Sequence, residues 1–162
     1  MKWVDSIPWI IAISGWFAAH AFSEARERRK DVKSQIEKII EKLSATEKLG
    51  ITFHTNERRE PSQARDLASD IQKLERSLNR VQILDPQSLK YPIIAFRKSI
   101  TLNNFDAGDF VKQAETSNLI QEISNSAFDL EDEIDGQYQE HYPSSFPYFK
   151  WPGFLNFLIF WR

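Results

Sequence analysis

The sequence predicts an all-α protein: an N-terminal transmembrane helix, then a small antiparallel helical bundle or set of helical hairpins, then an aromatic C-terminal tail. Three observations predict this. Apolar residues in the middle of the chain recur at spacings of three and four, as on one face of an α-helix. No β-type alternation persists over more than a few residues. All five tryptophans lie in the first 16 or the last 12 residues, and Trp is enriched where proteins meet lipid headgroups.

Composition excludes several classes of function. A chain of 162 residues has room for one compact domain with appendages. Its formal net charge of −2 and isoelectric point near 5.9 argue against a general nucleic-acid-binding protein, which carries a large basic excess. The absence of cysteine excludes disulfides, cysteine-ligated zinc and thiol catalysis. The predicted parts are an anchor over 1–22, a helical body over 23–136, a linker over 137–145 and a tail over 146–162.

The first 22 residues form the predicted anchor. From Trp3 to Phe22 the segment has 20 residues, about 30 Å as a helix, which matches the hydrocarbon core of a bilayer. Asp5 and His20 fall near its two ends, where a polar side chain stays hydrated. The residues expected to span the membrane are Ile7, Trp9, Ile10, Ile11, Ile13, Trp16 and Phe17.

Two other interpretations of this segment stay open. Ala19-His20-Ala21 fits the small-x-small pattern of a signal-peptide cleavage site, although basic residues just downstream resist export. A buried core helix is the second alternative, because the stretch is at the lower limit of length for a span. The position of the tryptophans and the asymmetry of charge favour the membrane anchor.

A basic cluster follows the anchor and is expected to face anionic headgroups. Its members are Arg26, Arg28, Arg29, Lys30 and Lys33. The N-terminal side offers only Lys2 and the α-amino group. The positive-inside rule then predicts a single-pass protein of the inner (cytoplasmic) membrane, with its N-terminus outside and its body in the cytoplasm.

The body is expected to contain four helices, over residues 23–49, 62–84, 92–103 and 107–135. Gly50 is the expected stop of the first helix, because glycine is common just after a helix C-terminus. Pro92 is expected to open the third helix, Asp106 to cap the fourth, and Gly136 to end it. The short loops predict antiparallel packing at the shallow angles of bundles and coiled coils.

Two apolar stripes are the predicted helix-packing surfaces, because their members share one helical face. They consist of Leu67, Ile71, Leu74 and Leu78, and of Ile120, Ile123, Leu130 and Ile134. Both stripes are narrow. The core is therefore completed either within a small bundle or by a protein partner or second copy, and the pattern does not choose between them.

The C-terminal tail is predicted to lie at a membrane interface through Trp151, Phe154, Phe157, Phe160 and Trp161. Its last apolar run has eight residues, about 12 Å as a helix, which is too short to span a bilayer. It is also too apolar to lie free in water. A tail docked on the helical body is the alternative.

No pattern typical of an enzyme or a metal site is present. The histidines His20, His54 and His141 lie in three different segments, and no phosphate-binding loop or nucleophile elbow occurs. The acidic run before Gly136 fits the start of a calcium loop, but Tyr142 stands where that loop requires Glu. We therefore expect no catalytic residue, cofactor, metal, nucleic acid or small-molecule substrate.

The boundary between anchor and body, carried by Gly15-Trp16, His20, Arg26 and Arg28-Arg29-Lys30, resembles that of small, uncharacterised bacterial single-span membrane proteins. The resemblance covers about the first 33 residues. It implies a bacterial inner-membrane setting and no activity. The leading hypothesis is a membrane-anchored scaffold or regulatory protein that binds a protein partner or itself. The alternatives are a membrane-perturbing effector using anchor and tail, and a soluble helical module with both apolar ends buried.

Overall fold

The computed structural model describes residues 7–143, apart from the side chains of Ile7, Pro8, Ile10, Ile11 and Ala18. This range contains helices and no strand, so the all-α prediction is confirmed. The helices are α1 (Ile7–Thr55), α2 (Pro61–Leu78), α3 (Pro86–Thr101) and α4 (Asn118–His141). Residues 1–6 and the predicted tail, with Trp151, Phe154, Phe157, Phe160 and Trp161, lie outside the described residues.

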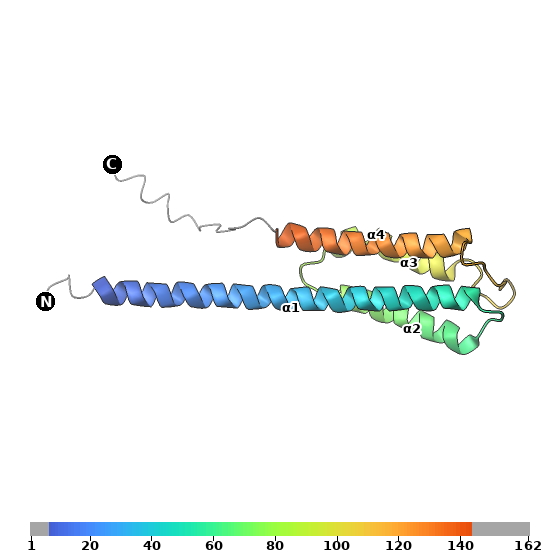
Figure 1. Ribbon diagram of the computed structural model, residues 1–162, viewed down its shortest axis with the longest axis horizontal. Coiled ribbons are helices and arrows are strands. Elements are labelled where there is room, and N and C mark those ends of the chain that lie inside the picture. Colours follow the sequence, from blue (N-terminus) through green and yellow to red (C-terminus); the bar gives the residue numbers. More distant parts are fainter. Residues whose placement is uncertain (1–6, 144–162) are drawn as a thin grey trace.

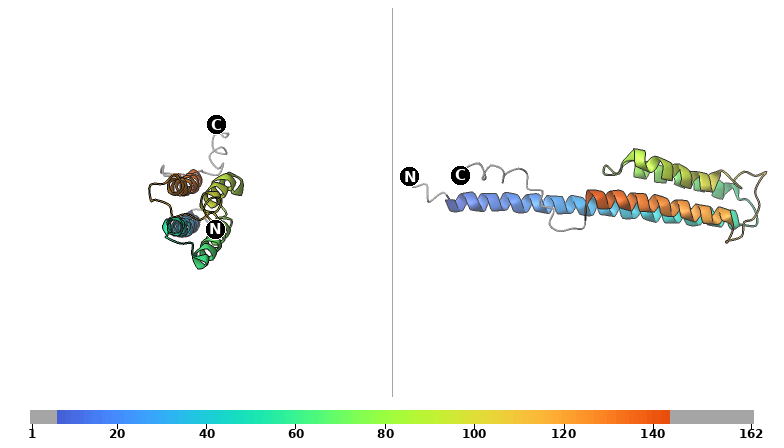
Figure 2. Two further views of the ribbon diagram at one scale, coloured as in Figure 1. Left: turned by 90° about the vertical axis from the view of Figure 1, so that its right-hand side faces the viewer. Right: turned by 90° about the horizontal axis from the view of Figure 1, so that it is seen from above.

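The four helices run alternately up and down and pack around a common axis (Figures 1 and 2). α1 packs against α2 and α4, α3 packs against α4, and α2 meets α3 over a smaller area. α1 continues well past the ends of the other three helices (Figure 1). We call residues 7–28 the extension, and residues 29–143, which contain the packed helices, the body.

The core of the body is built by the stripes that the sequence displays. All eight predicted helix-packing residues of α2 and α4 are buried, with exposed fractions of 6% or less. α1 adds Ile36, Ile39, Leu43 and Phe53, and α3 adds Phe96 and Ile100. Both stripes thus belong to one core within a single chain, and they are not available as an open surface for a partner.

α1 does not end where its glycine suggests. Gly50 lies inside the helix, which continues to Thr55. A Cβ atom at this position would lie 3.3 Å from Cγ1 of Ile100, so the missing side chain lets α3 approach α1 closely. The anchor and the first body helix, expected as separate parts, form one helix of 49 residues, about 74 Å long.

The other helix boundaries also differ from the expected ones. α3 begins at Pro86 because Asp85 caps it, its side chain accepting from the backbone N–H groups of Gln87 and Ser88. Pro92 therefore lies in the helix interior instead of opening the helix. α4 begins at Asn118, where Ser117 serves as the N-cap in place of Asp106. It continues through Gly136 to His141.

No helix in the part of the chain that the structure describes is both long enough and apolar enough to cross a membrane. The transmembrane part of the predicted fold is therefore not supported. Along α1, polar Ser14 and His20 interrupt the apolar stretch, and charged residues follow directly from Glu24 onward.

The two helical glycines permit a stability test. A Cβ atom added at Gly136 would meet no other atom within 4 Å, so Gly136→Ala is expected to raise the free energy of unfolding by about 1 kcal/mol through helix propensity. Gly50→Ala is expected to be less stable than the wild type, because the new methyl group meets the fully buried Ile100. Urea unfolding followed by circular dichroism measures both. Equal stabilisation by the two substitutions would contradict the close contact at Gly50.

Candidate functional site

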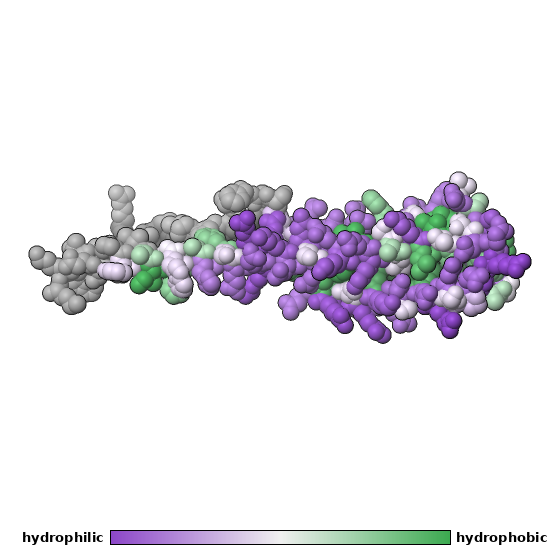
Figure 3. Space-filling model, turned by 60° about the horizontal axis from the view of Figure 1, so that its bottom comes forward, coloured by the Kyte–Doolittle hydropathy of each residue, from purple (hydrophilic) through white to green (hydrophobic). Residues whose placement is uncertain are grey.

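The extension exposes large hydrophobic side chains that no other described helix accompanies (Figures 1 and 3). Of the seven residues predicted to span a membrane, four have described side chains, and all four are exposed. Their exposed fractions are 69% for Trp9, 54% for Ile13, 62% for Trp16 and 61% for Phe17. Apolar patches of this kind on a protein surface mark sites of contact with a partner or a membrane.

These hydrophobic residues are not confined to one face of the helix. Trp9, Ile13 and Trp16 are spaced by four and three residues and share a face. The Trp16 ring packs edge-on against Phe17 at 5.1 Å and stacks on His20 at 5.7 Å between ring centroids. Phe22, itself 55% exposed, lies about 120° round the helix from Trp16. This distribution differs from the single stripe of a helix that packs on one neighbour.

The predicted basic cluster lies where the extension joins the body, and all five of its residues are exposed. Three of them form ion pairs along α1. Arg28 pairs with Glu24 at 2.5 Å, Lys30 with Glu27 at 3.1 Å and Lys33 with Glu37 at 3.6 Å. Exposed pairs of this kind contribute at most about 1 kcal/mol each. The cations therefore remain available to an anionic surface at little cost.

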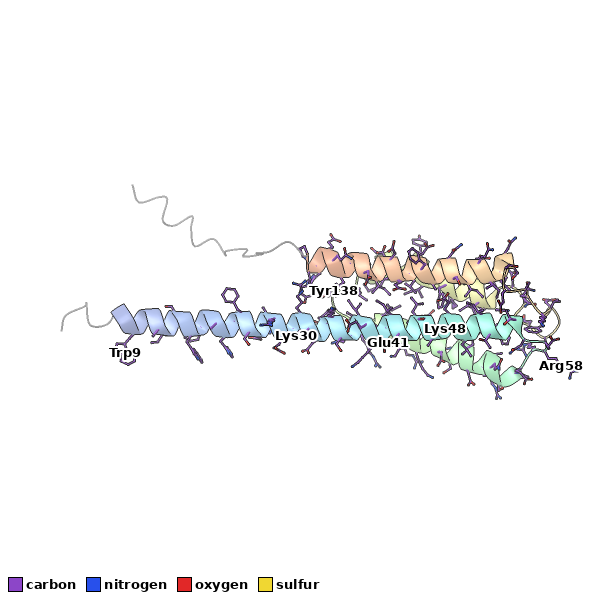
Figure 4. The ribbon with its side chains drawn as sticks, in the orientation of Figure 1. Trp9, Lys30, Glu41, Lys48, Arg58 and Tyr138 are labelled. Atoms are coloured by element: carbon purple, nitrogen blue, oxygen red, sulfur yellow. The ribbon has the colours of Figure 1, made fainter. Side chains whose placement is uncertain are left out.

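Arg29 joins the base of the extension to the end of α4. Its Nη2 donates to the carbonyl oxygen of Tyr142 at 3.3 Å, and its guanidinium lies 5.6 Å from the centroid of the Tyr142 ring. A cation at a helix C-terminus is favoured by the helix dipole. Figure 4 labels Lys30 on α1 and Tyr138 near the end of α4, at similar positions along the long axis, with Trp9 at the far end of α1. The sequence carries no local signal for this contact, because 113 residues separate its two partners.

A buried polar network closes the opposite end of the body. His54 is fully buried; its Nε2 lies 3.0 Å from the carbonyl oxygen of Ile100, and its Nδ1 lies 3.2 Å from Nδ2 of Asn104. These neighbours require a neutral ring that donates from Nε2 and accepts at Nδ1. Oδ1 of Asn104 accepts from the N–H of Val111, and the His54 carbonyl accepts from the N–H of Gln113. The network therefore ties the end of α1 to the loop before α4.

The body offers no arrangement of groups that indicates catalysis. A groove of about 520 Å³ lies between α3 and α4, and Ser126 is the residue of its lining that carries a hydroxyl group. That hydroxyl group forms a hydrogen bond with the hydroxyl group of Ser99 and not with a base. Within residues 7–143, no group of three His, Asp or Glu side chains is placed to hold a metal ion. Four of the ten residues that line the groove have amide side chains: Asn103, Asn118, Gln121 and Asn125.

Comparisons of this chain with protein-family models, with curated proteins and with solved structures found no match. Functional inference therefore rests on the geometry of the chain itself. The features of that geometry on which a proposal can be based are the exposed apolar extension and the adjoining basic cluster.

The His54 network predicts a dependence of stability on pH. Burial lowers the pKa of His54 below its ordinary value of 6.5, and this effect exceeds the opposing hydrogen bonds to Ile100 and Asn104. Above pH 6.5 the ring is neutral in both states and the network contributes fully. Below pH 6.5 the unfolded chain binds a proton at His54 more readily than the folded chain does. The free energy of unfolding therefore falls by up to about 1.4 kcal/mol per pH unit.

Urea unfolding at a series of pH values tests this against two variants. His54→Gln is expected to remove the steep fall below pH 6.5, relative to the wild type. His141→Gln, which changes an exposed histidine, is the control and is expected to keep it. Parallel profiles for the wild type and His54→Gln would show that His54 does not cause the dependence.

Proposed function

We propose that this chain is a membrane-attached helical protein whose extension inserts into a bilayer and whose body is held at the membrane surface to bind another protein. The observation that carries the proposal is the exposure of Trp9, Ile13, Trp16 and Phe17, next to a basic cluster, on a helix segment that none of the other described helices accompanies. Aromatic and aliphatic side chains beside Arg and Lys suit the two layers of a bilayer, its hydrocarbon interior and its headgroups.

The free energy expected from burying the exposed side chains supports a stable attachment to the bilayer. Burying one large apolar side chain contributes about 1.5 to 3 kcal/mol. Four such side chains contribute roughly 6 to 12 kcal/mol before the costs of ordering and of burying polar groups. Each well-placed basic residue adds about 1 kcal/mol near an anionic membrane surface, less the repulsion from Glu24, Glu27 and Asp31. The hydrophobic term is the larger of the two.

The direction of insertion follows from the same charges. With the basic cluster on the body side of the extension, the positive-inside rule favours a body in the cytoplasm, at the inner membrane of a bacterium. A short apolar segment seldom spans unaided. The depth that the extension reaches is therefore a property to be measured, by the accessibility of a reporter at the N-terminus to an impermeant reagent.

The surface that remains for a protein partner lies on α3 and α4. Because the apolar stripes are buried inside the body, they do not supply it. Three exposed hydrophobic residues supply this surface: Tyr91, Leu102 and Phe128, with exposed fractions of 77%, 68% and 64%. Aromatic anchors of this kind are typical of protein interfaces.

Vesicle flotation tests the attachment. We expect the double variant Trp16→Ser, Phe17→Ser to lower partition onto phosphatidylcholine vesicles at least about a hundredfold, because two large side chains leave the apolar phase. The matched control is Tyr91→Ser, Phe128→Ser, which removes two aromatic rings of similar exposure from the body.

The control pair is expected to float with the vesicles like the wild type. If both double variants float equally, or if the wild type does not float, the extension is not the membrane-binding element. Retention of the wild-type chain in the membrane pellet after a carbonate wash is expected for an inserted helix, and release would indicate surface association alone.

A further inference from the structure

A hollow opens at the end of the body from which the extension leaves. It has a volume of about 660 Å³ and lies between α1, the turn joining α2 to α3, and the end of α4. The basic residues that line it are Arg28, Arg80 and His141, one from each of these three segments. Amide and hydroxyl donors come from Gln35, Gln82 and Tyr142, and Asp31 is the acidic residue of the lining.

The two guanidinium groups of the hollow are available to a ligand. Among the described residues, the side chain of Arg80 has no hydrogen-bond or ion-pair partner. Arg28 pairs with Glu24, one turn earlier on the same helix, and the two side chains are 75% and 55% exposed. An ion pair this exposed is weak, so Arg28 can leave Glu24 and bind an anionic ligand instead. With one carboxylate against two guanidiniums, the lining favours a negative ligand.

We propose that this hollow binds a phosphate ester group, carried by an anionic lipid headgroup or by a small soluble phosphate compound. A guanidinium matches two phosphate oxygens at once, and two of them from different segments can hold one phosphate between them. The side-chain amides of Gln35 and Gln82 supply further donors. Asp31 opposes the anion and limits its affinity.

The position of the hollow suits the lipid source, and this part of the inference rests on the proposed membrane attachment. Arg28 lies six residues beyond Phe22, the last exposed aromatic residue of the extension. Six residues of helix measure about 9 Å. The polar headgroup region on each side of a bilayer is roughly 5 to 8 Å thick. With Phe22 at the edge of the hydrocarbon, the Cα atom of Arg28 lies just outside the headgroup region. Because side chains on a helix tilt toward its N-terminus, the guanidinium of Arg28 at the mouth of the hollow reaches back to the phosphates.

Vesicles with and without anionic lipid test the site in the full chain. Arg80→Gln is expected to lower partition onto vesicles in which one lipid in five is phosphatidylglycerol by about fivefold. Its effect on pure phosphatidylcholine is expected to be smaller, because choline balances the charge of the phosphate there. Asp31→Asn is expected to raise partition onto the anionic vesicles by about twofold to fivefold. Arg65→Gln, an exposed arginine near the start of α2 at the other end of the body, is the control.

A second arm separates the two phosphate sources. Titration calorimetry with inorganic phosphate is run on the wild type and on Arg80→Gln. If phosphate binding depends on Arg80 and all variants partition equally onto vesicles, the hollow is assigned to a soluble phosphate compound. Vesicle partition that depends on Arg80 and Asp31 in opposite directions assigns it to the headgroup.

The failure of this inference and the failure of the proposed function give different results. If the variants partition alike and none binds phosphate, the hollow is not a phosphate site, although membrane attachment stands. If neither the wild type nor any variant binds vesicles, while the wild type binds phosphate through Arg80, the proposed membrane attachment is wrong and the phosphate site stands. Circular dichroism melting of each variant, expected to match the wild type, shows that the exposed substitutions leave the fold intact.

Discussion

α1 is much longer than the other three helices, and this difference in length determines which hydrophobic side chains are exposed. α1 has 49 residues, whereas α2, α3 and α4 have 18, 16 and 24. α2 and α4 pack against α1 from about Arg29, which contacts the end of α4, to the end of α1. Burial of the apolar stripes stabilises this part of the chain. What remains of α1 keeps its helical backbone hydrogen bonds but has no described helix beside it. Its large hydrophobic side chains, such as Trp9 and Trp16, are therefore exposed in the described part of the chain.

Closure of the core within one chain also changes where a protein partner would bind. The residues that look most suited to packing, such as Leu67 and Ile123, are fully buried. Buried serines also join α3 to α4, since Ser99 and Ser126 share a hydrogen bond of 2.8 Å. The faces available for recognition are thus the extension, the hollow at its base and the outer surface of α3 and α4.

The helical class and the core-facing residues are predictable from the sequence, because a period of 3.6 residues identifies one face of a helix without knowledge of its neighbours. Helix ends are not. Gly50 fits a helix stop by local rules, but the close approach of Ile100 gives the glycine a packing role instead. Asp85 before a proline fits the end of one helix, yet its carboxylate caps the next one.

The least predictable parts are those made by residues far apart in the chain. The partners of His54 lie 46 and 50 residues away, and Arg80 reaches the hollow only because the bundle folds back on α1. No spacing rule detects such contacts. The Trp and Phe content of the extension predicts its exposed rings, whereas its apolar character is weaker than a spanning helix requires in the described residues.

The continuity of α1 has a mechanical consequence. Beyond Pro8 in its first turn, the helix has no proline as far as Thr55. Sharp bends in helices arise mostly at prolines and at Gly/Ser pairs, and the adjacent Ser14 and Gly15 form such a pair near the outer end of α1. From Trp16 onward, the extension and the part of α1 inside the body are therefore one helix without such an interruption. A tilt of the body is passed on to this part of the extension, and a force applied at Trp16 acts as a torque on the contact between Arg29 and Tyr142.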